Sequence, residues 1–307
     1  MVTRRDILRS ASLGAVASVL PGVVFAKAET QSRLVLVILR GAADGLAIAA
    51  PFGDPHYRKV RGELAMPAPG KDGGLLKLDE LFGLHPSLAG VHDAFKKKQA
   101  LVVHAVASPY RERSHFDGQD VLENGGSEVG LLRDGWLNRA LEPLGGSLGH
   151  EAAIAMAVNT PLVLRGENSV TSWAPSRLPD TEESTSRRLQ DLYANDEFFA
   201  TRLAQAINSQ EIAGDEAGMQ RNGGNNRNAA AVRSMMQATA RFLTAEDGPR
   251  IAVLEAGGWD THANQGTTNG ALANRLAGLD AGLVALREGL GSTWSNTVVA
   301  VVTEFGR

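Results

Sequence analysis

Two short stretches of the sequence place metal-binding side chains directly after runs of apolar residues. The first, residues 258–262, contains Asp260 and His262. Side chains two residues apart in an extended loop point the same way, so this pair can bind one cation. The second stretch contains Glu304 and Arg307 and also follows an apolar run. Open α/β sheets bind ligands beyond the carboxyl ends of their strands, so both stretches lie where chemistry is expected.

Two further loops carry polar side chains after apolar runs. Asp44 lies in a glycine-rich turn behind residues 34–39, and Ser114 and His115 follow residues 101–106. Because loops after parallel strands converge on one edge of a sheet, all four loops are expected to meet there. We therefore predict a metal site formed by Asp44, Asp260, His262 and Glu304, with Ser114, His115, Arg40 and Arg307 as catalytic residues.

The chemistry of this donor set suits a hard or borderline divalent ion. Oxygen and nitrogen ligands of this kind suit zinc, manganese or magnesium, and the chain has no cysteine to supply a thiolate. Ser114 is predicted at the N-terminus of a helix, where the dipole favours anions and a nearby cation would activate the hydroxyl as a nucleophile. The arginines would neutralise an anionic substrate.

Several of these residues also have ordinary structural interpretations. Asp44 precedes a glycine as turn residues do, Ser114 can be only a helix cap, and Glu304 can simply pair with Arg307. Arg40 can likewise form a structural ion pair. His85 is interpreted as a helix-entry residue and His104 as a core histidine within a strand.

Alternating apolar runs and helical patterns predict the fold class. The predicted strands span residues 34–39, 101–106, 152–158, 251–255 and 297–302, and the predicted helices span 86–98, 114–123, 136–141 and 269–290. Residues 51–82 are predicted as a surface excursion, and the region of about 180–245 as a helical insertion. We expect a three-layer αβα sandwich with a mostly parallel sheet.

Bulk composition and the N-terminus restrict the partners and the location. The 307 residues carry a net charge of only −3, which gives no reason to expect nucleic-acid binding, and no stable membrane span is predicted. Arg4 and Arg5 precede a short apolar segment and small residues, which is typical of a twin-arginine signal peptide over residues 1–28. We therefore expect the twin-arginine translocase as a partner, a periplasmic or secreted location, and an α/β domain over residues 29–307.

Ordered motifs along the chain resemble one bacterial family. They are the paired arginines, the segment 39–46, Leu84-His85-Pro86, Ser114-His115-Phe116, the segment 135–139, the segment 257–262 and the segment 303–307. Together they resemble the domain-of-unknown-function family numbered 1501, which is similar to the alkaline phosphatase and sulfatase superfamily. The resemblance implies an exported, metal-dependent hydrolase with an alkaline-phosphatase-like fold.

The same resemblance implies roles for individual residues and also shows two departures. It implies Asp44 as the ligand after the first strand, Ser114 as the nucleophile, and Asp260, His262 and Glu304 as further ligands. The superfamily spaces its Asp and His more widely than Asp260 and His262, and it has a His where this chain has Phe305. The family also continues with an Asp-His-Gly segment, so we expect this chain to be a C-terminally truncated fragment.

The functional expectation is an exported metal-dependent hydrolase of a small anionic phosphate or sulfate ester, acting through a serine nucleophile. Two alternatives stay open. One is a non-catalytic secreted binding protein that keeps the hydrolase fold, and the other is an inactive truncated fragment.

Overall fold

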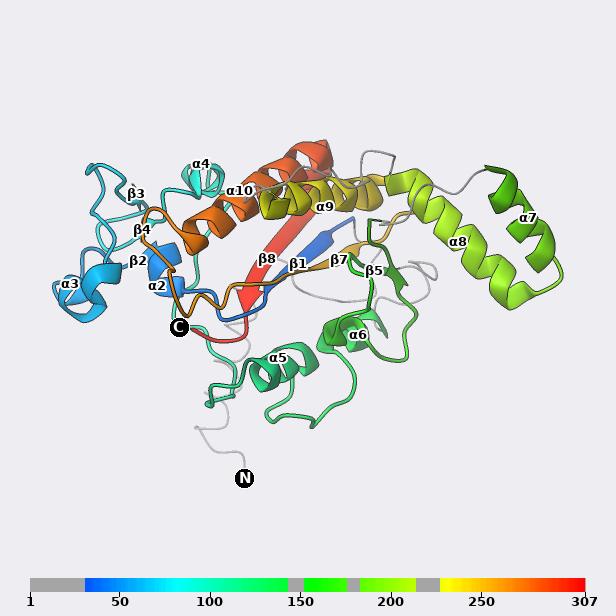
Figure 1. Cartoon of the computed structure of the whole chain (residues 1–307), viewed down its shortest axis with the longest axis horizontal. Helices are drawn as coiled ribbons and strands as arrows, with labels where there is room; N and C mark the ends of the chain where they lie inside the picture. The colour runs from blue at the N-terminus through cyan, green and yellow to red at the C-terminus, as the bar shows by residue number, and fades with distance from the viewer. Residues whose placement is uncertain (1–30, 143–151, 176–182, 214–226, 307) are drawn as a thin grey trace, which may run out of the picture.

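A five-stranded parallel sheet forms the centre of the computed structural model, which describes residues 31–142, 152–175, 183–213 and 227–306 (Figure 1). The predicted signal segment 1–28 and Arg307 lie outside the described residues. The strand order is β6-β5-β7-β1-β8, and every pairing in the sheet is parallel. Its strands are β1 (Arg33–Leu39), β5 (Ala153–Ala155), β6 (Thr171–Ser172), β7 (Ile251–Ala256) and β8 (Thr297–Thr303).

Helices cover both faces of this sheet, which confirms the predicted α/β class (Figure 1). The helices α4 (Ala89–Lys96), α9 (Arg227–Thr244) and α10 (Ala271–Leu290) lie on one face, and α5 (His115–Asn124) and α6 (Trp136–Leu141) lie on the other. Strand β1 contributes to both cores because its side chains alternate: Val35 and Val37 pack with α9 and α10, whereas Leu36 and Ile38 pack with α6.

Two further helices extend past the sheet on the side of β5 (Figure 1). They are α7 (Glu183–Tyr193) and α8 (Glu197–Ala213), and together with α9 they fall within the region predicted as a helical insertion. In the described parts of the chain, no helix combines the length and apolar character that a bilayer crossing requires.

Residues 45–84 form short elements beside the sheet. They are α2 (Gly45–Ile48), β2 (Ala49–Ala50), α3 (Tyr57–Arg61), the 3-10 turn η1 (Gly62–Leu64), β3 (Leu76–Lys77) and β4 (Gly83–Leu84). Among the described residues, the 3-10 turns η4 (Leu162–Leu164) and η6 (Gly291–Asn296) occur later in the chain. Strands β2, β4 and β3 pair in an antiparallel sheet of their own. The predicted surface excursion is therefore a small folded unit with its own core around Tyr57 and Met66.

The strand predicted over residues 101–106 is wrong. The segment is irregular, and Leu101, Val103 and Val106 are 75%, 66% and 74% exposed. Ala105 has a φ of 56°, which interrupts any extended run. His104 is not a core histidine, because it is exposed and its ring stacks on Phe82 at 3.9 Å. An apolar run alone therefore did not specify a strand here.

The same substitution of valine by threonine, at one buried and one exposed position, tests whether residues 101–106 form a packed strand. Val253 is fully buried in β7, so Val253→Thr should lower the free energy of unfolding by about 1–3 kcal/mol because the new hydroxyl has no buried partner. Val103→Thr should change it by less than about 0.5 kcal/mol, as exposed substitutions do. Urea unfolding measures both. Equal destabilisation by the two variants would show that residues 101–106 are packed as a strand after all.

Candidate metal centre

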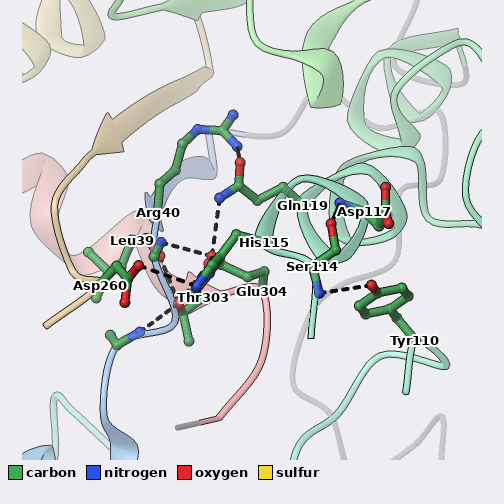
Figure 2. A network of polar contacts seen from close by, with 12 residues as sticks. Leu39, Arg40, Tyr110, Ser114, His115, Asp117, Gln119, Asp260, Thr303 and Glu304 are labelled. Carbon is green, nitrogen blue, oxygen red and sulfur yellow. Dashed lines mark hydrogen bonds and ion pairs between the residues drawn. The ribbon is translucent and has the colours of Figure 1, made fainter. Parts of the chain in front are cut away.

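The carboxyl ends of three neighbouring strands meet at one edge of the sheet. Leu39 at the end of β1 is in register with Ala256 of β7 and with Thr303 of β8. The residues that follow each strand therefore leave the sheet side by side. The predicted convergence of these three loops is confirmed, and α5 brings a fourth segment to the same edge (Figure 2).

Three side chains at this edge form a group of potential metal donors: His115, Asp260 and His262. One ligand atom from each lies within 4.8 Å of the other two. Asp260 Oδ2 is 2.7 Å from His262 Nε2 and 3.6 Å from His115 Nε2. The side chains of Asp260 and His115 are about one-third exposed, at 32% and 28%, while His262 is 77% exposed, so the group faces solvent.

These spacings fit one shared ion. Ligands bound at about 2.0–2.1 Å in a tetrahedral arrangement lie about 3.3 Å apart. The two measured separations from Asp260 Oδ2, 2.7 and 3.6 Å, lie on either side of that value. Small side-chain movements would therefore place all three donors around one cation. Two imidazoles and one carboxylate also leave coordination positions open for another ligand.

Glu304 lies behind this group rather than in it. Its side chain is fully buried, and Oε1 accepts hydrogen bonds from the Gly41 amide at 2.8 Å, His115 Nδ1 at 2.9 Å and Gln119 Nε2 at 3.1 Å. Burial opposes ionisation, but hydrogen bonds from backbone amides, His115 and Gln119 outweigh it and lower the pKa of Glu304. An ionised Glu304 can only accept, so Nδ1 of a neutral His115 carries the proton and Nε2 presents its lone pair toward Asp260.

Arg40 is held by carboxylates on the side away from the donors. Its guanidinium pairs with Glu255 and, at 2.8 Å, with Glu123, and it donates to Gln119 Oε1 at 2.8 Å (Figure 2). Burial alone would lower the pKa of Arg40, but Glu123 and Glu255 outweigh it and raise that pKa. The structural ion pair considered from the sequence is therefore present. Through Gln119, Arg40 also fixes the orientation of Glu304.

Asp44 belongs to a separate buried cluster. Its Oδ2 pairs with Arg61 and accepts from Gln265 Nε2 at 2.6 Å, while Thr261 Oγ1 donates to Gln265 Oε1 at 2.7 Å. Thr261 lies between Asp260 and His262, and its side chain points the opposite way, as alternation in an extended segment requires. Asp44 therefore anchors the loop that carries two of the donors, instead of contributing a donor itself.

His85, directly after β4, anchors the same loop. It is fully buried, its Nε2 lies 2.9 Å from the Thr267 carbonyl, and its Nδ1 accepts from the Ser87 amide at 3.1 Å. Both ring nitrogens are therefore satisfied in the neutral tautomer with the proton on Nε2. Burial lowers the pKa of His85 below its ordinary value, against the opposing effect of the Thr267 hydrogen bond.

This lowered pKa predicts a pH dependence of stability. As the pH falls to about 6.5, His85 binds a proton in the unfolded chain, whereas in the folded chain it does so only at a lower pH. The free energy of unfolding should therefore fall with decreasing pH, by at most about 1.4 kcal/mol per pH unit for one proton. His85→Gln keeps a donor and an acceptor but cannot titrate, so its slope between pH 7 and pH 5 should be shallower. Urea unfolding across that range measures both slopes, and identical slopes would refute the assignment.

Ser114 caps helix α5. Its Oγ accepts a hydrogen bond from the Asp117 amide at 3.3 Å, and its amide donates to Tyr110 Oη at 3.0 Å. Figure 2 shows these two contacts on the opposite side of His115 from Asp260. The predicted N-cap is confirmed. The same helix start places His115 one residue later, pointing at Glu304 and Asp260.

The structure thus groups some of the predicted residues and separates others. Asp260 and His262 lie together as expected, and His115, expected as a catalytic residue, joins them as a donor. Asp44 lies in its own cluster, Glu304 is behind His115, and Arg307 lies outside the described residues. Gln119 and Gln265 were missed. Gln119 had a usable signal, because it lies four residues after His115 on one helix and so shares its face.

Comparisons with known proteins give a family but no function. A family model described as "Protein of unknown function (DUF1501)" matches residues 31–307. No curated protein matches the chain. No solved structure matches it either.

Proposed function

We propose a function from the site itself, since this chain belongs to the DUF1501 family of proteins of unknown function. The proposal is a metal-dependent hydrolase that cleaves a small anionic ester, of phosphate or sulfate, at the edge formed by β7, β1 and β8. The observation that carries it is the group of His115, Asp260 and His262 around one point, with a buried carboxylate behind His115.

The donor set supports a resident divalent ion. Imidazole ligands suit zinc and other transition metals, whereas sites for magnesium are built mainly from oxygen ligands. We therefore favour zinc or manganese over magnesium. A bound ion would polarise an ester oxygen and lower the pKa of a water molecule at the site.

The protein's own residues would orient this chemistry. Glu304 holds the ring of His115 through Nδ1, and Gln119 and the Gly41 amide hold Glu304. Asp44, through Gln265 and Thr261, holds the loop of Asp260 and His262. Each donor therefore has a buried partner or an anchored backbone behind it, as precise metal sites require.

Water is a better candidate for the attacking group than Ser114. The Ser114 hydroxyl accepts from the Asp117 amide, on the side of α5 away from Asp260 (Figure 2). A serine nucleophile should lose all turnover in Ser114→Ala. Attack by water should leave turnover in that variant, reduced only through loss of the cap, which costs about 0.5–2 kcal/mol of stability.

Loss of the partner behind His115 gives a direct prediction. Glu304→Gln keeps the shape of the side chain and an amide oxygen that can accept from His115 Nδ1, but it removes the negative charge. The affinity for zinc should fall by about 10–100-fold, as it does when outer partners of metal-binding histidines are mutated. Isothermal titration calorimetry with zinc measures this.

Glu255→Gln is the matched control for that prediction. Glu255 is a carboxylate near the same edge and pairs with Arg40, without a hydrogen bond to any of the three donors. Its substitution should leave zinc affinity within about twofold, since its charge is partly exposed to solvent and Arg40 keeps its pair with Glu123. Equal losses in the two variants would show that Glu304 acts only through general charge at this edge.

The fold and the N-terminus extend the proposal. A parallel sheet covered by helices on both faces, with the donors at its carboxyl edge, supports an alkaline-phosphatase-like identity as an analogy of architecture. Arg4 and Arg5, followed by a short apolar segment, support export by the twin-arginine translocase to the periplasm or beyond. Folding before export would allow the ion to be loaded in the cytoplasm.

One observation favours a second candidate, a non-catalytic binding protein that uses the same edge. His262 is three-quarters exposed, so the donors form an open surface that could hold an anion or a glycan without cleaving it. Under this alternative, the double variant Asp260→Ala/His262→Ala keeps partner capture. Under the hydrolase proposal, the same variant loses turnover.

The hydrolase proposal is tested on the purified full-length chain. We expect about one divalent ion per chain by elemental mass spectrometry, cleavage of a generic aryl phosphate or aryl sulfate, and loss of that cleavage on chelation with recovery when zinc or manganese is restored. No bound ion, or cleavage that survives chelation, would overturn it.

A further inference from the structure

An anionic ester at this edge needs a cationic side chain, and the arginines predicted from the sequence do not supply one among the described residues. Arg40 is paired with Glu123 and Glu255. Arg61, which also lies close to the edge, is paired with Asp44. Both guanidiniums already have carboxylate partners, so neither is available to a substrate without breaking an existing ion pair.

Arg275 differs from both in its surroundings. It lies on the second turn of α10 and reaches back over the loop that carries Asp260. Its Nη1 donates only a long hydrogen bond of 3.3 Å, to the Gly257 carbonyl, and its buried Nε has no hydrogen-bond partner. No carboxylate in the described parts of the chain pairs with it. The guanidinium is therefore positioned by the fold but incompletely satisfied.

Gly258 leaves the space that this guanidinium occupies. A Cβ at Gly258 would lie 2.6 Å from both Nη atoms of Arg275, and the φ of +82° also disfavours any other residue there. Gly258 precedes Asp260 by two residues, which places their Cα atoms within about 7.6 Å of each other. The guanidinium of Arg275, on α10, therefore contacts this loop two residues before Asp260.

We propose that Arg275 binds the anionic group of the substrate beside His115, Asp260 and His262, which makes a tetrahedral oxyanion the ligand of this edge. The proposal rests on the proposed function for its placement next to the ion. An arginine fork donates two parallel hydrogen bonds to phosphate or sulfate oxygens, a geometry that an ammonium group does not reproduce. The Nη groups of Arg275, which make one long hydrogen bond, would then gain acceptors on binding.

A purely structural role for Arg275 makes a different prediction. If Arg275 only holds the backbone through its hydrogen bond to the Gly257 carbonyl, substituting it makes the loop of Asp260 and His262 less ordered, and the metal affinity falls. If it binds the oxyanion, metal affinity is kept and anion affinity falls. Measuring both affinities separates the two roles.

The experiment uses the full-length chain and isothermal titration calorimetry with inorganic phosphate, with and without added zinc. Arg275→Met should weaken phosphate binding at least tenfold, and Arg275→Lys should weaken it by a smaller factor because the charge is kept without the fork. Arg287→Met is the matched control, since Arg287 lies on the same helix in its last turn, and it should bind phosphate as the unmodified chain does. Zinc affinity should be the same in all four proteins.

Phosphate binding that is unchanged in Arg275→Met, or absent from the unmodified chain in both titrations, would overturn the proposal. A loss of zinc affinity in Arg275→Met would show instead that Arg275 holds the loop of Asp260 and His262 in place. If zinc does not bind the unmodified chain but phosphate does and Arg275→Met loses it, the proposed hydrolase fails while the oxyanion site stands. Repeating the titration with sulfate shows which oxyanion the site prefers.

Discussion

Replacing either Asp260 or His262 with alanine is expected to lower zinc affinity by more than a hundredfold. Each supplies one of only three donors in the group, so its loss leaves two protein ligands around the ion. The loss should exceed the 10–100-fold cost of removing an outer partner such as Glu304. Competition titration against a zinc chelator of known affinity measures the change.

His56→Ala provides the control, because it removes an exposed imidazole outside the group. Thermal unfolding in the absence of metal should be nearly unchanged in His262→Ala, since that side chain is mostly exposed, and serves as the metal-free reference for Asp260→Ala, whose side chain is about one-third exposed. Zinc should then stabilise the unmodified chain and His56→Ala, but not the two donor variants, by simple linkage. Equal stabilisation of all four proteins would place the zinc elsewhere.

Substitution of Gly41 by alanine is expected to damage both the fold and the site. Gly41 has a φ of +118°, and a Cβ there would lie 2.4 Å from the Asp260 amide nitrogen and 3.0 Å from the Asp260 Cβ. Backbone strain alone should cost about 1–3 kcal/mol. The clash must also push Asp260 away from β1, and the Gly41 amide is a donor to Glu304. Zinc affinity should therefore fall together with stability.

Gly45→Ala is the control at the start of α2, where a new Cβ meets no atom within 4 Å. That variant should be neutral, or more stable by about 0.4–1 kcal/mol, because alanine restricts the unfolded chain. Urea unfolding and a zinc titration on both variants make the comparison. Normal stability and normal zinc affinity in Gly41→Ala would show that a side chain at position 41 does not displace Asp260.

Sequence patterns identified the parts of the fold that are encoded locally. The apolar runs of β1, β7 and β8, the helical period of α10 and the Ser114 cap of α5 each depend on residues close in the chain. The convergence of their loops followed from the general rule for parallel sheets. Asp260 and His262 were found because their spacing of two is itself a local signal.

Contacts between residues far apart in the chain determine the roles of Glu304 and Asp44, which local sequence patterns did not predict correctly. Glu304 was expected as a ligand, but its buried carboxylate accepts hydrogen bonds from the amide of Gly41 and from His115. Asp44 was expected in the same role and is instead paired with Arg61, a residue in a segment predicted only as an excursion. No pattern near either residue specifies its partner.

His115, Asp260 and His262 are proposed to hold one divalent ion. Anomalous X-ray diffraction at the zinc absorption edge, from crystals of the full-length chain grown with zinc, tests it most directly. We expect one strong peak about 2.0–2.2 Å from His115 Nε2, His262 and Asp260. A peak at the Asp44 cluster, or no peak among these three side chains, would contradict it.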